Sequence, residues 1–515
     1  PNPHLPSHST PSLLLLIDMT WVVSILPLLS LTSSCLSESS IIPSPFSVFR
    51  LTPSSPYQKA AIELLYKNAS MLNLDFWKTS HDGSGFWDVM VGEREQSTLL
   101  SVLDRANISF EKTIDDVEKL IKTREHSPRK SISFSRRLKD DSVSSSGYDF
   151  RRYSSYPAMQ KWMRNLARDY PHLVQLTSIG LTHEGRSIDG IEIGLNRETS
   201  RVFWIDAGIH AREWAAPHTA LYFIHQLTSR WEDPEMRKML ETITFVILPC
   251  VNPDGYEFTR SSTNPHIRLW RKNRSEMICR NDHWGRRRCC RGVDLNRNFD
   301  FHFKESGSSD DPCSEIYQGK TAFSEPETKA IRDAVLSRRY RDRMDGFITL
   351  HTYSQIWIHS YGHKKEAYPG DIDDLYKVAK RATAALEAMY GTKYIVGSGA
   401  DTLYPASGGS EDWVKQTTHV KYVYLIELRP EEKNWDGFIL DERELLPTAR
   451  ETWAGIRVVA EAILDRKAHM DNQKLPGRCV NVKLSCARWL RERPQLCTQV
   501  PLFMKENCAL ACGIC

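Results

Sequence analysis

The sequence lacks a strong excess of either charge. Its 515 residues include 68 Lys and Arg against 64 Asp and Glu, which gives a formal net charge of +4. Such an even balance favours neither a nucleic-acid partner nor binding to a membrane surface. The charged fraction of 26% and the apolar fraction of 41% are typical of a globular protein in water. A chain of this length predicts two or three domains.

A long unbroken apolar run is also missing. The most apolar stretch near the N-terminus, 13–31, is interrupted by Asp18 and Pro27, so a membrane anchor is less favoured than a secretory signal. Met19 begins an apolar run that ends in small residues, although no Lys or Arg marks its start. We therefore predict an irregular N-terminus with a signal peptide over 1–37. The mature chain should be secreted and extracellular, with no membrane span.

Among the features that are present, the segment GIHAREW at 208–214 is the most informative. It follows a strand-like run, VFWIDA, and precedes a helix-like run, AAPHTALYFIHQL. His210 and Glu213 can chelate one Zn²⁺ through an imidazole nitrogen and a carboxylate oxygen. The pair alone is weak evidence, because a chain with 17 His contains such a spacing by chance.

Two other strand-like runs, GFITLH and KYVYLIELR, carry His351 and Glu427 near their ends. A lone His in such a place is more often structural, but a carboxylate in so apolar a run costs free energy unless it is compensated. Functional sites of open α/β sheets collect at the carboxyl ends of parallel strands. Ligation by two His and one Glu leaves a fourth zinc position for water, as in catalytic sites. We therefore expect zinc to be held by His210, Glu213 and His351, with Glu427 beside it.

Groups suited to anions lie in two further segments, IRLWRKN and VDLNRNFD. The planar fork of Arg matches a carboxylate, so one Arg could hold a substrate carboxylate and another a developing oxyanion. The alternative is that Arg271 belongs to a solvated basic patch with Arg268, Lys272 and Arg274. The Gly-rich loop at 404–410 lacks the Lys-Ser/Thr ending of a phosphate loop and can instead carry a mobile Tyr.

Taken together, these segments resemble the zinc metallocarboxypeptidases of the pancreatic A/B type. The matching segments stand in the family's order between about 148 and 466; they are HAREW, NPDGYEFT, RLWRKNRS, GVDLNRNFD, HTYSQ, YPASGGSEDW and IELR. So many matches exclude chance. The resemblance implies a catalytic domain over 148–466 with a mixed, mainly parallel sheet flanked by helices, an α/β fold. It also implies hydrolysis of the C-terminal residue of peptides and proteins.

The resemblance further implies a role for each matched residue. One Zn²⁺ per chain would be bound by His210, Glu213 and His351, with Glu427 as the general base and Arg271 stabilising the oxyanion. The terminal carboxylate of the substrate would be held by Asn296, Arg297 and Tyr404. The neighbouring subsite would be lined by Arg212 and Tyr353. None of these positions is substituted, which argues against an inactive relative.

Specificity should depend on Glu411, which the resemblance places at the floor of the pocket for the terminal side chain. In the family, an apolar residue there accompanies apolar or aromatic preference, and Asp accompanies a preference for Lys and Arg. A buried carboxylate without a cationic neighbour favours a bound cation, so we predict a preference for Lys and Arg. The alternative is that Glu411 turns outward or is protonated, leaving an apolar pocket lined partly by Leu403 and Leu425.

A smaller unit precedes the catalytic region. Strand-like runs (VFRLT, LDFWKTS, FWDVMV and ISFEKTI) alternate with helix-like runs at 57–72 and 93–106, which predicts a small α+β domain over 45–125. This unit resembles the activation domain of the procarboxypeptidases. The linker at 126–147 is basic and then Ser-rich, and its paired basic residues are natural protease targets: Arg129 and Lys130, Arg136 and Arg137. We therefore expect a zymogen released by an activating protease.

Six cysteines crowd 479–515, too short a stretch for a stable core without cross-links. Spacing alone leaves fifteen pairings open. The pattern resembles the ShK-type domain, and that resemblance implies the pairs Cys479–Cys515, Cys486–Cys508 and Cys497–Cys512. A zinc knuckle is the alternative, disfavoured by the secretory context. Channel-blocking relatives carry Lys-Tyr where this chain has Leu502 and Phe503, so its partner is an unknown ligand rather than a potassium channel.

The remaining cysteines lie outside that unit. Cys290 and Cys313 match the disulfide of the family's catalytic domain. Cys279 and Cys289 bracket an enlarged loop, ICRNDHWGRRRCC, and we expect them to pair with each other. Cys250, in an apolar strand, is expected to be a buried free thiol. Cys35 would leave with the signal peptide.

Two other classes of function stay open. One is a secreted binding protein that acts through its ShK-type domain, against which the complete His, Glu, His and Glu set argues. The other is a regulatory carboxypeptidase of the N/E type, which lacks an activation domain and carries a transthyretin-like domain. About 49 residues follow Arg466, too few for that β-domain plus a six-cysteine unit. The expected partners are peptide and protein C-termini and an activating protease.

Overall fold

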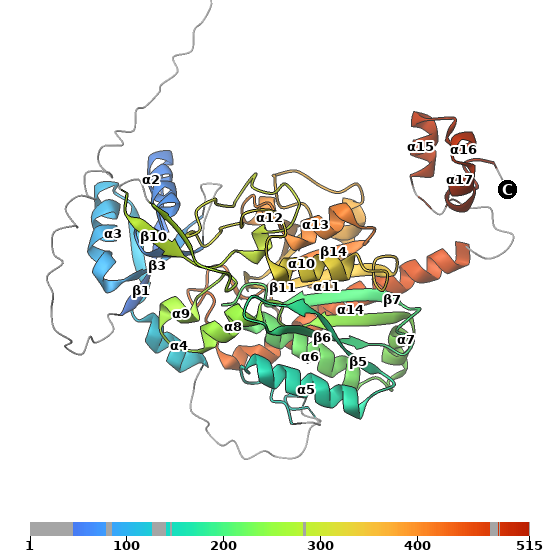
Figure 1. The fold of residues 1–515 in the computed structure, drawn as a ribbon, viewed down its shortest axis with the longest axis horizontal. Coiled ribbons are helices and arrows are strands. Elements are labelled where there is room, and N and C mark those ends of the chain that lie inside the picture. Colours follow the sequence, from blue (N-terminus) through green and yellow to red (C-terminus); the bar gives the residue numbers. More distant parts are fainter. Residues whose placement is uncertain are drawn as a thin grey trace, which may run out of the picture. The chain divides into compact units, whose positions relative to one another are not determined.

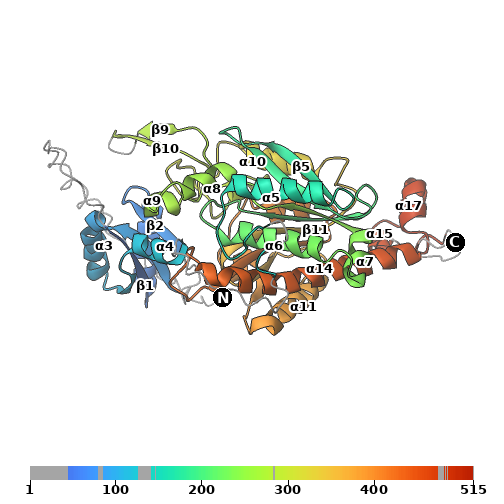
Figure 2. The same ribbon diagram turned by 90° about the horizontal axis from the view of Figure 1, so that it is seen from below.

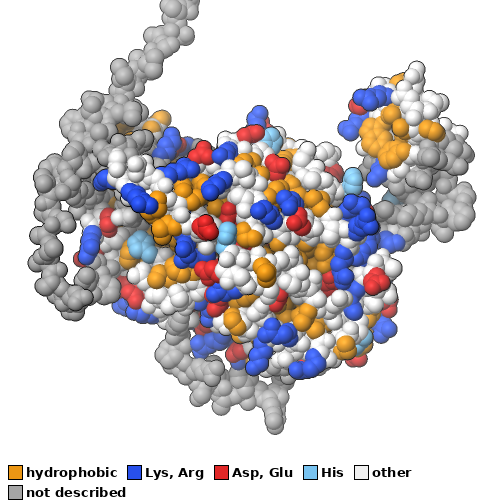
Figure 3. Space-filling view, in the orientation of Figure 1, with side chains coloured by type: hydrophobic (Ala, Val, Ile, Leu, Met, Phe, Trp, Pro, Cys, Tyr) orange, Lys and Arg blue, Asp and Glu red, His pale blue; other side chains and the backbone are white. Residues whose placement is uncertain are grey.

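The computed structural model describes residues 45–78, 85–125, 141–144, 147–281, 285–473, 481, 483 and 485–513. The expected signal peptide and the paired basic residues of the linker lie outside these residues. Within them, no helix combines the length and apolar character needed to cross a membrane. On the face shown in Figure 3, Lys and Arg side chains are interspersed with Asp and Glu, in keeping with the even charge balance.

The N-terminal region builds the expected small α+β unit (Figure 1). Its antiparallel sheet has the order β2-β3-β1-β4, from strands β1 (Phe46–Thr52), β2 (Leu74–Lys78), β3 (Trp87–Gly92) and β4 (Ser109–Ile114). Helices α2 (Pro56–Lys67) and α3 (Glu93–Arg105) pack on it through side chains such as Ile62, Leu65, Leu99 and Leu103. Helix α2 ends five residues before the expected end at 72, because Asn68 caps it with bonds to the carbonyl groups of its last turn.

The sequence did not lead us to expect helix α4 (Val117–Glu125), which follows β4. Its apolar side chains, Val117 and Ile121, join a core made by two regions of the chain. Trp77 and Met90 of the small unit contribute to that core, and the later region contributes Leu269, Tyr353, Phe438 and Ile439. The small unit is therefore packed against the large one through a shared apolar interface.

The large region contains an eight-stranded sheet of order β13-β12-β14-β11-β7-β8-β6-β5. The strands are β5 (Val174–Leu181), β6 (Ser187–Ile193), β7 (Arg201–Ala207), β8 (Ile243–Leu248), β11 (Met344–Ser354), β12 (Ile356–His359), β13 (Ile395–Ser398) and β14 (Tyr422–Glu431). Neighbours from β8 through β7 and β11 to β14 run parallel, as do β12 and β13. The remaining pairings, of β12 with β14, β8 with β6 and β6 with β5, are antiparallel. The expected mixed, mainly parallel α/β fold is confirmed.

Two apolar cores cover the two faces of this sheet (Figure 2). One core is built with helices α5 (Tyr156–Asp169), α6 (Ala215–Ser229), α7 (Pro234–Thr242), α11 (Ile372–Tyr390) and α14 (Leu445–Gln473). The other is built with α10 (Pro326–Val335) and α13 (Ser410–Thr417). Helix α6 is buried along almost its whole surface, because α14 packs on its outer side. Short helices α8 (Pro253–Arg260), α9 (Pro265–Arg268) and α12 (Gly399–Thr402) complete the loops.

The enlarged loop forms a hairpin of β9 (Ile278–Asn281) and β10 (Arg287–Cys290). Cys279 and Cys289 form the expected disulfide across it, and Cys290 is bonded to Cys313. The hairpin reaches the small unit, since the Arg288 guanidinium donates to the Ser70 carbonyl oxygen at 2.7 Å. The Ser70 hydroxyl in turn donates to Asp311, 3.1 Å away and close to Cys313. Cys250 is buried and free, as expected.

The C-terminal region folds into three short helices, α15 (Cys486–Glu492), α16 (Leu496–Gln499) and α17 (Pro501–Asn507). Disulfides join Cys486 to Cys508 and Cys497 to Cys512, as expected. The expected Cys479–Cys515 pair lies outside the described residues. Among the described residues, the fully buried centre of this unit consists of Cys486, Met504 and Cys508, so the cross-links supply the order that a larger apolar core would otherwise provide.

Candidate active site

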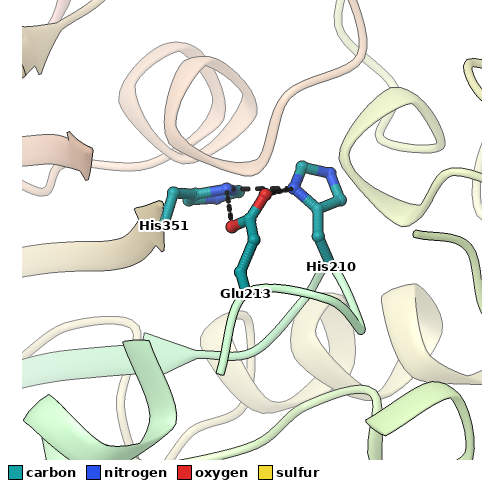
Figure 4. A group of neighbouring side chains, drawn as sticks. All are labelled: His210, Glu213 and His351. Atoms are coloured by element: carbon teal, nitrogen blue, oxygen red, sulfur yellow. Dashed lines mark hydrogen bonds and ion pairs between the residues drawn. The ribbon is translucent and has the colours of Figure 1, made fainter. Parts of the chain in front are cut away.

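Three buried side chains from two neighbouring strand ends face one point (Figure 4). His210 and Glu213 lie in the loop that follows β7, and His351 lies in β11, which pairs with β7. Glu213 bridges the two imidazoles, with its oxygens 2.8 Å from His210 Nδ1 and 3.2 Å from His351 Nδ1. The two Nδ1 atoms are 3.2 Å apart. Parallel pairing of adjacent strands therefore brings together the ligands expected from the sequence.

This geometry fits a zinc ion. Two ligand atoms of a tetrahedral zinc, each about 2.0–2.1 Å from the ion, lie about 3.3 Å apart. The three measured separations are close to that value. Burial disfavours the charged form of His351, but Glu213 outweighs this effect and raises the pKa of His351 to about 9. A cation between these groups would take the place of the proton that the imidazoles otherwise hold.

Asp294 orients this cluster, and sequence reasoning missed it. Its buried carboxylate accepts from His210 Nε2 at 3.1 Å, which leaves the Nδ1 lone pair for a metal. The same carboxylate accepts from Arg271 Nε at 3.0 Å. Burial would raise the pKa of Asp294, but Arg271, Arg297 and His210 hold it well below its usual range. The available signal was a carboxylate flanked by the apolar Val293 and Leu295, just ahead of the matched Asn296 and Arg297.

Glu427 lies directly opposite His351 in the register of β14 and β11. Its Oε2 atom is buried and has no hydrogen-bond partner. Burial raises the pKa of Glu427 to about 8, and the charge of Glu213 adds to that effect while His351 opposes it. A carboxyl group with a raised pKa beside a metal site is suited to take up and release a proton near neutral pH.

All the residues expected at the site line one cavity of about 790 Å³: His210, Arg212, Glu213, Arg271, Asn296, Arg297, His351, Tyr353, Tyr404, Glu411 and Glu427. Arg297 lies 3.3 Å from the Tyr404 hydroxyl and is fixed by the carbonyl oxygens of Asn296 and Gly307, both 2.8 Å away. Gly408 permits this arrangement, since it has a φ of +77° and a Cβ there would meet the Arg297 carbonyl oxygen at 2.3 Å. The cavity thus places guanidinium groups around the cluster.

The outer part of the cavity is closed by the small N-terminal unit. The Arg212 guanidinium lies 3.2 Å from both carboxylate oxygens of Asp75, in strand β2. Arg268 and Glu125 of helix α4 form an ion pair that excludes solvent completely, with a bond of 2.7 Å from Arg268 Nε. The alternative of a solvated basic patch is wrong, because Arg268, Arg271 and Lys272 are all buried. Sequence reasoning missed Asp75 as the partner of Arg212 and Glu125 as the partner of Arg268.

Glu411 lies on the first turn of α13 and is 7% exposed. Its Oε2 atom is buried and has no hydrogen-bond partner, and no ion pair of Glu411 is found among the described residues. Gly362, Gly399, Leu403 and Leu425 line the same cavity. The alternative that Glu411 turns outward is therefore wrong.

The fold and the cavity together define a metal-dependent hydrolase, in which a cation would lie between His and Glu ligands while guanidinium groups face an anionic substrate. Comparison with protein families narrows this class. A family model described as "Zinc carboxypeptidase" matches residues 159–455, more than half of the sequence, and the chain belongs to that family. A model described as "Carboxypeptidase activation peptide" matches residues 49–124, and one described as "ShK domain-like" matches 478–515.

Individual relatives agree with this family. The chain is 40% identical to a carboxypeptidase B of Astacus astacus over 317 residues, 62% of this chain and 99% of that protein. It is 33% identical to carboxypeptidase A1 of Bos taurus over 419 residues, 81% of this chain and 94% of that protein. The solved structure of thrombin activatable fibrinolysis inhibitor is similar with a TM-score of 0.69 and 29% identity, covering 82% of this chain and 99% of that one. The chain is thus a metallocarboxypeptidase with an activation peptide, and the match to that peptide argues against the N/E-type alternative.

Proposed function

We propose that the chain is a secreted zymogen that binds one zinc ion and, once activated, removes Lys or Arg from the C-termini of peptides and proteins. Membership of the zinc carboxypeptidase family supports the reaction. The basic preference rests on one observation, the buried Glu411 carboxylate that faces the cavity without a cationic partner among the described residues. Secretion is supported by the disulfides, which form and persist in oxidising compartments.

In this proposal, His210, Glu213 and His351 hold the zinc ion. When bound, zinc supplies Lewis-acid polarisation of the scissile carbonyl and lowers the pKa of water. Glu427 takes a proton from the attacking water at its unpartnered Oε2 and passes it to the leaving amine. Arg271, held by Asp294, meets the negative charge that develops on the carbonyl oxygen. Asn296, Arg297 and Tyr404 hold the terminal carboxylate, which limits the reaction to the last residue.

The side chain of that last residue would enter the pocket that contains Glu411. Gly362 and Gly399 line the same cavity, and because they carry no side chains they leave its space to the side chain of the substrate. A Lys or Arg side chain would bring its cation to a carboxylate that is already desolvated, so the attraction is stronger than in water. An apolar terminal residue would leave Glu411 buried without compensation.

Latency follows in this proposal from the position of the N-terminal unit. The Asp75 carboxylate accepts a hydrogen bond from the Arg212 guanidinium. Phe76, Trp77 and Met90 of the same unit line the cavity. The metal ligands keep their geometry beneath this cover. A solved relative is described as activatable by thrombin, which fits the release of activity by a protease.

The test compares matched peptides that end in Arg, Lys, Phe or Leu and a peptide with an amidated C-terminus. The full chain is cut briefly with trypsin, the trypsin is inhibited, and kcat/KM is measured. We expect Arg and Lys to be removed fastest and the amidated peptide to resist. Glu411→Gln should lose the preference for Arg and Lys while it still removes Leu. Faster removal of Phe or Leu than of Arg and Lys would refute the basic preference, and cleavage of the amidated peptide would refute the proposed role of the terminal carboxylate.

A further inference from the structure

A second cluster of ligand-type side chains lies outside the active site. His183 is in the turn between β5 and β6, while Glu325 occupies the N-cap position of α10 and Glu327 follows in its first turn. One candidate ligand atom from each residue lies within 4.8 Å of the other two. His183 Nε2 and Glu325 Oε2 are 2.9 Å apart. These residues contribute nothing to the cavity described above.

The two carboxylates of this cluster are buried. Glu325 is 5% exposed and Glu327 is fully buried. Glu327 Oε1 has no hydrogen-bond partner, although a buried carboxylate oxygen without a partner costs free energy. The His183 side chain is 27% exposed, so the cluster is open to solvent on that side. An ion could therefore enter past His183 and meet an unsatisfied oxygen.

The surroundings hold the carboxylates in place but do not neutralise them. Asn273 Nδ2 donates to Glu325 Oε2 at 2.8 Å and to Glu327 Oε2 at 3.0 Å. The Asn273 amide is itself oriented by the backbone N–H of Val293, 2.8 Å from its Oδ1 atom. Ser324 donates to the other oxygen of Glu325 at 2.6 Å. Among the described residues, no Lys or Arg forms an ion pair with either carboxylate, and His183 is the one basic partner.

From this geometry we infer that His183, Glu325 and Glu327 form a second site for a divalent cation, with zinc as the ion that suits one imidazole and two carboxylates. Zinc binds this type of ligand set at three positions and takes water at a fourth. The ion would bond the free lone pair of neutral His183 and the unpartnered oxygen of Glu327. A proton on His183, which Glu325 favours by raising the pKa of the imidazole, would be released on binding.

The site would have a structural role. It would tie the β5–β6 turn to the start of α10, two elements that are far apart in the sequence and pack against each other. An ion that binds the folded chain alone stabilises it by mass action, in proportion to the logarithm of its concentration over its Kd. The inference does not depend on the proposed function, because the two ion sites share no ligand.

The test counts zinc ions on the purified full-length chain after equilibration with ZnCl₂ and removal of excess ion. We expect two zinc ions per chain in the wild type, one in Glu327→Gln, one in His183→Ala and one in His210→Ala. His302→Ala is the matched control, because His302 and Glu305 form an exposed pair that lacks a buried third ligand. This control should keep two ions.

A thermal measurement distinguishes a lost ion from a lost fold. Added ZnCl₂ should raise the Tm of His210→Ala, and the rise should vanish when Glu327→Gln is added to it. Peptidase activity of Glu327→Gln should match the wild type, which shows that the variant is folded. One zinc ion in the wild type that is lost in His210→Ala, or equal zinc content in the wild type and Glu327→Gln, would overturn the inferred site. Loss of zinc from His210→Ala tests the active site separately.

Discussion

The inner and outer parts of the active-site cleft differ in where their partners come from. We define the inner part as His210, Glu213, Arg271, His351 and Glu427. The hydrogen-bond and ion-pair partners of these side chains belong to the catalytic region; Asp294, for example, pairs with both His210 and Arg271. The outer part consists of Arg212, Arg268 and Tyr353, whose partners include Asp75, Glu125 and Trp77 of the N-terminal unit.

This difference indicates how latency is achieved in the uncut chain. The activation region supplies ion-pair partners to Arg212 and Arg268 of the outer part, and it covers the cavity. The side chains of the inner part already have their mutual contacts beneath it. Removal of the activation region would therefore expose Arg212 and Arg268 without rebuilding the metal ligands. In the proposed zymogen, cover of the cavity rather than a distorted site would account for latency. Substitutions in the two parts test this difference, and their effects on activity should decrease from the inner part to the outer part.

The largest effect is expected in the inner part, from Glu427→Gln. The amide cannot accept the proton of the attacking water, so kcat of the activated enzyme should fall by at least about 10²-fold. The packing and the metal ligands are unchanged, so the zinc content of this variant should equal that of the wild type. Steady-state kinetics and metal analysis check both points. A variant that retained a tenth of the wild-type kcat would rule out Glu427 as the base.

Arg271→Gln should have the next largest effect. The variant loses the charge that meets the developing oxyanion, so kcat should fall by about 10²–10³-fold while KM changes little. Asp294 keeps His210 as a partner, so zinc should still bind. Separate determination of kcat and KM on one peptide distinguishes loss of transition-state stabilisation from loss of substrate binding. A rise in KM at constant kcat would assign Arg271 to ground-state binding.

In the outer part, Glu125→Gln should have the greatest effect, because it leaves Arg268 charged and fully buried. Loss of one partner of such a pair costs about 3–5 kcal/mol. The N-terminal unit should then dock less tightly, and activity of the uncut chain should rise by roughly tenfold or more. Glu111→Gln, at an exposed position of the same unit, is the control. If the uncut Glu125→Gln variant stayed as inactive as the uncut wild type, and regained full activity after cleavage, the Arg268–Glu125 pair would not be what keeps the N-terminal unit docked.

Asp75→Asn should act in the same direction but less strongly, since the Asp75 side chain is 16% exposed and its bonds to Arg212 are 3.2 Å long. We expect activity of the uncut chain to rise a few-fold, with no change after tryptic cleavage. The assay is hydrolysis of one peptide before and after cleavage. An effect larger than that of Glu125→Gln would reverse the ranking of the two contacts.

The smallest effect is expected from Glu432→Gln. Glu432 pairs with Lys78 at 2.6 Å, but its side chain is 35% exposed. Pairs this open to solvent contribute about 0–1 kcal/mol. Latency and Tm should therefore stay close to those of the wild type. A clear loss of latency would show that solvent-exposed contacts at the interface matter as much as the buried ones.

The inner part was the easier of the two to predict from the sequence. His210, His351 and Glu427 stand at the ends of apolar runs, and parallel strands bring such ends together. Arg212 and Tyr353 of the outer part were expected at the site, but the partners of Arg212 and Arg268 could not be predicted, because Arg212 and Asp75 are 137 residues apart and Arg268 and Glu125 are 143 apart. No local pattern pairs such residues. Four basic residues in seven positions look solvated in the sequence, but Arg268 is paired with the N-terminal unit while Arg271 and Lys272 are bonded within the catalytic region.

Helix α4 was missed for a related reason. Its two buried apolar residues, Val117 and Ile121, contact the shared interface rather than the core of their own unit. A nine-residue segment with five charged side chains gives a weak apolar period on its own. Asp294 was overlooked because the resemblance directed attention to Asn296 and Arg297, whereas its contribution depends on two bonds to distant side chains.

The hairpin of β9 and β10 has a consequence for which protein ends can reach the catalyst. The disulfide between Cys290 and Cys313 anchors it to a segment that lines the cavity, whereas the Cys279–Cys289 disulfide joins its own two strands. Removal of the activation region would cost Arg288 its bond to Ser70, but that covalent anchor would remain. A segment beside the cavity would therefore stay fixed to the hairpin in the activated enzyme. Such a fixed border should admit a slender, unstructured tail more readily than a C-terminus packed against a folded body, so the accessibility of a chain end should select substrates together with its last residue.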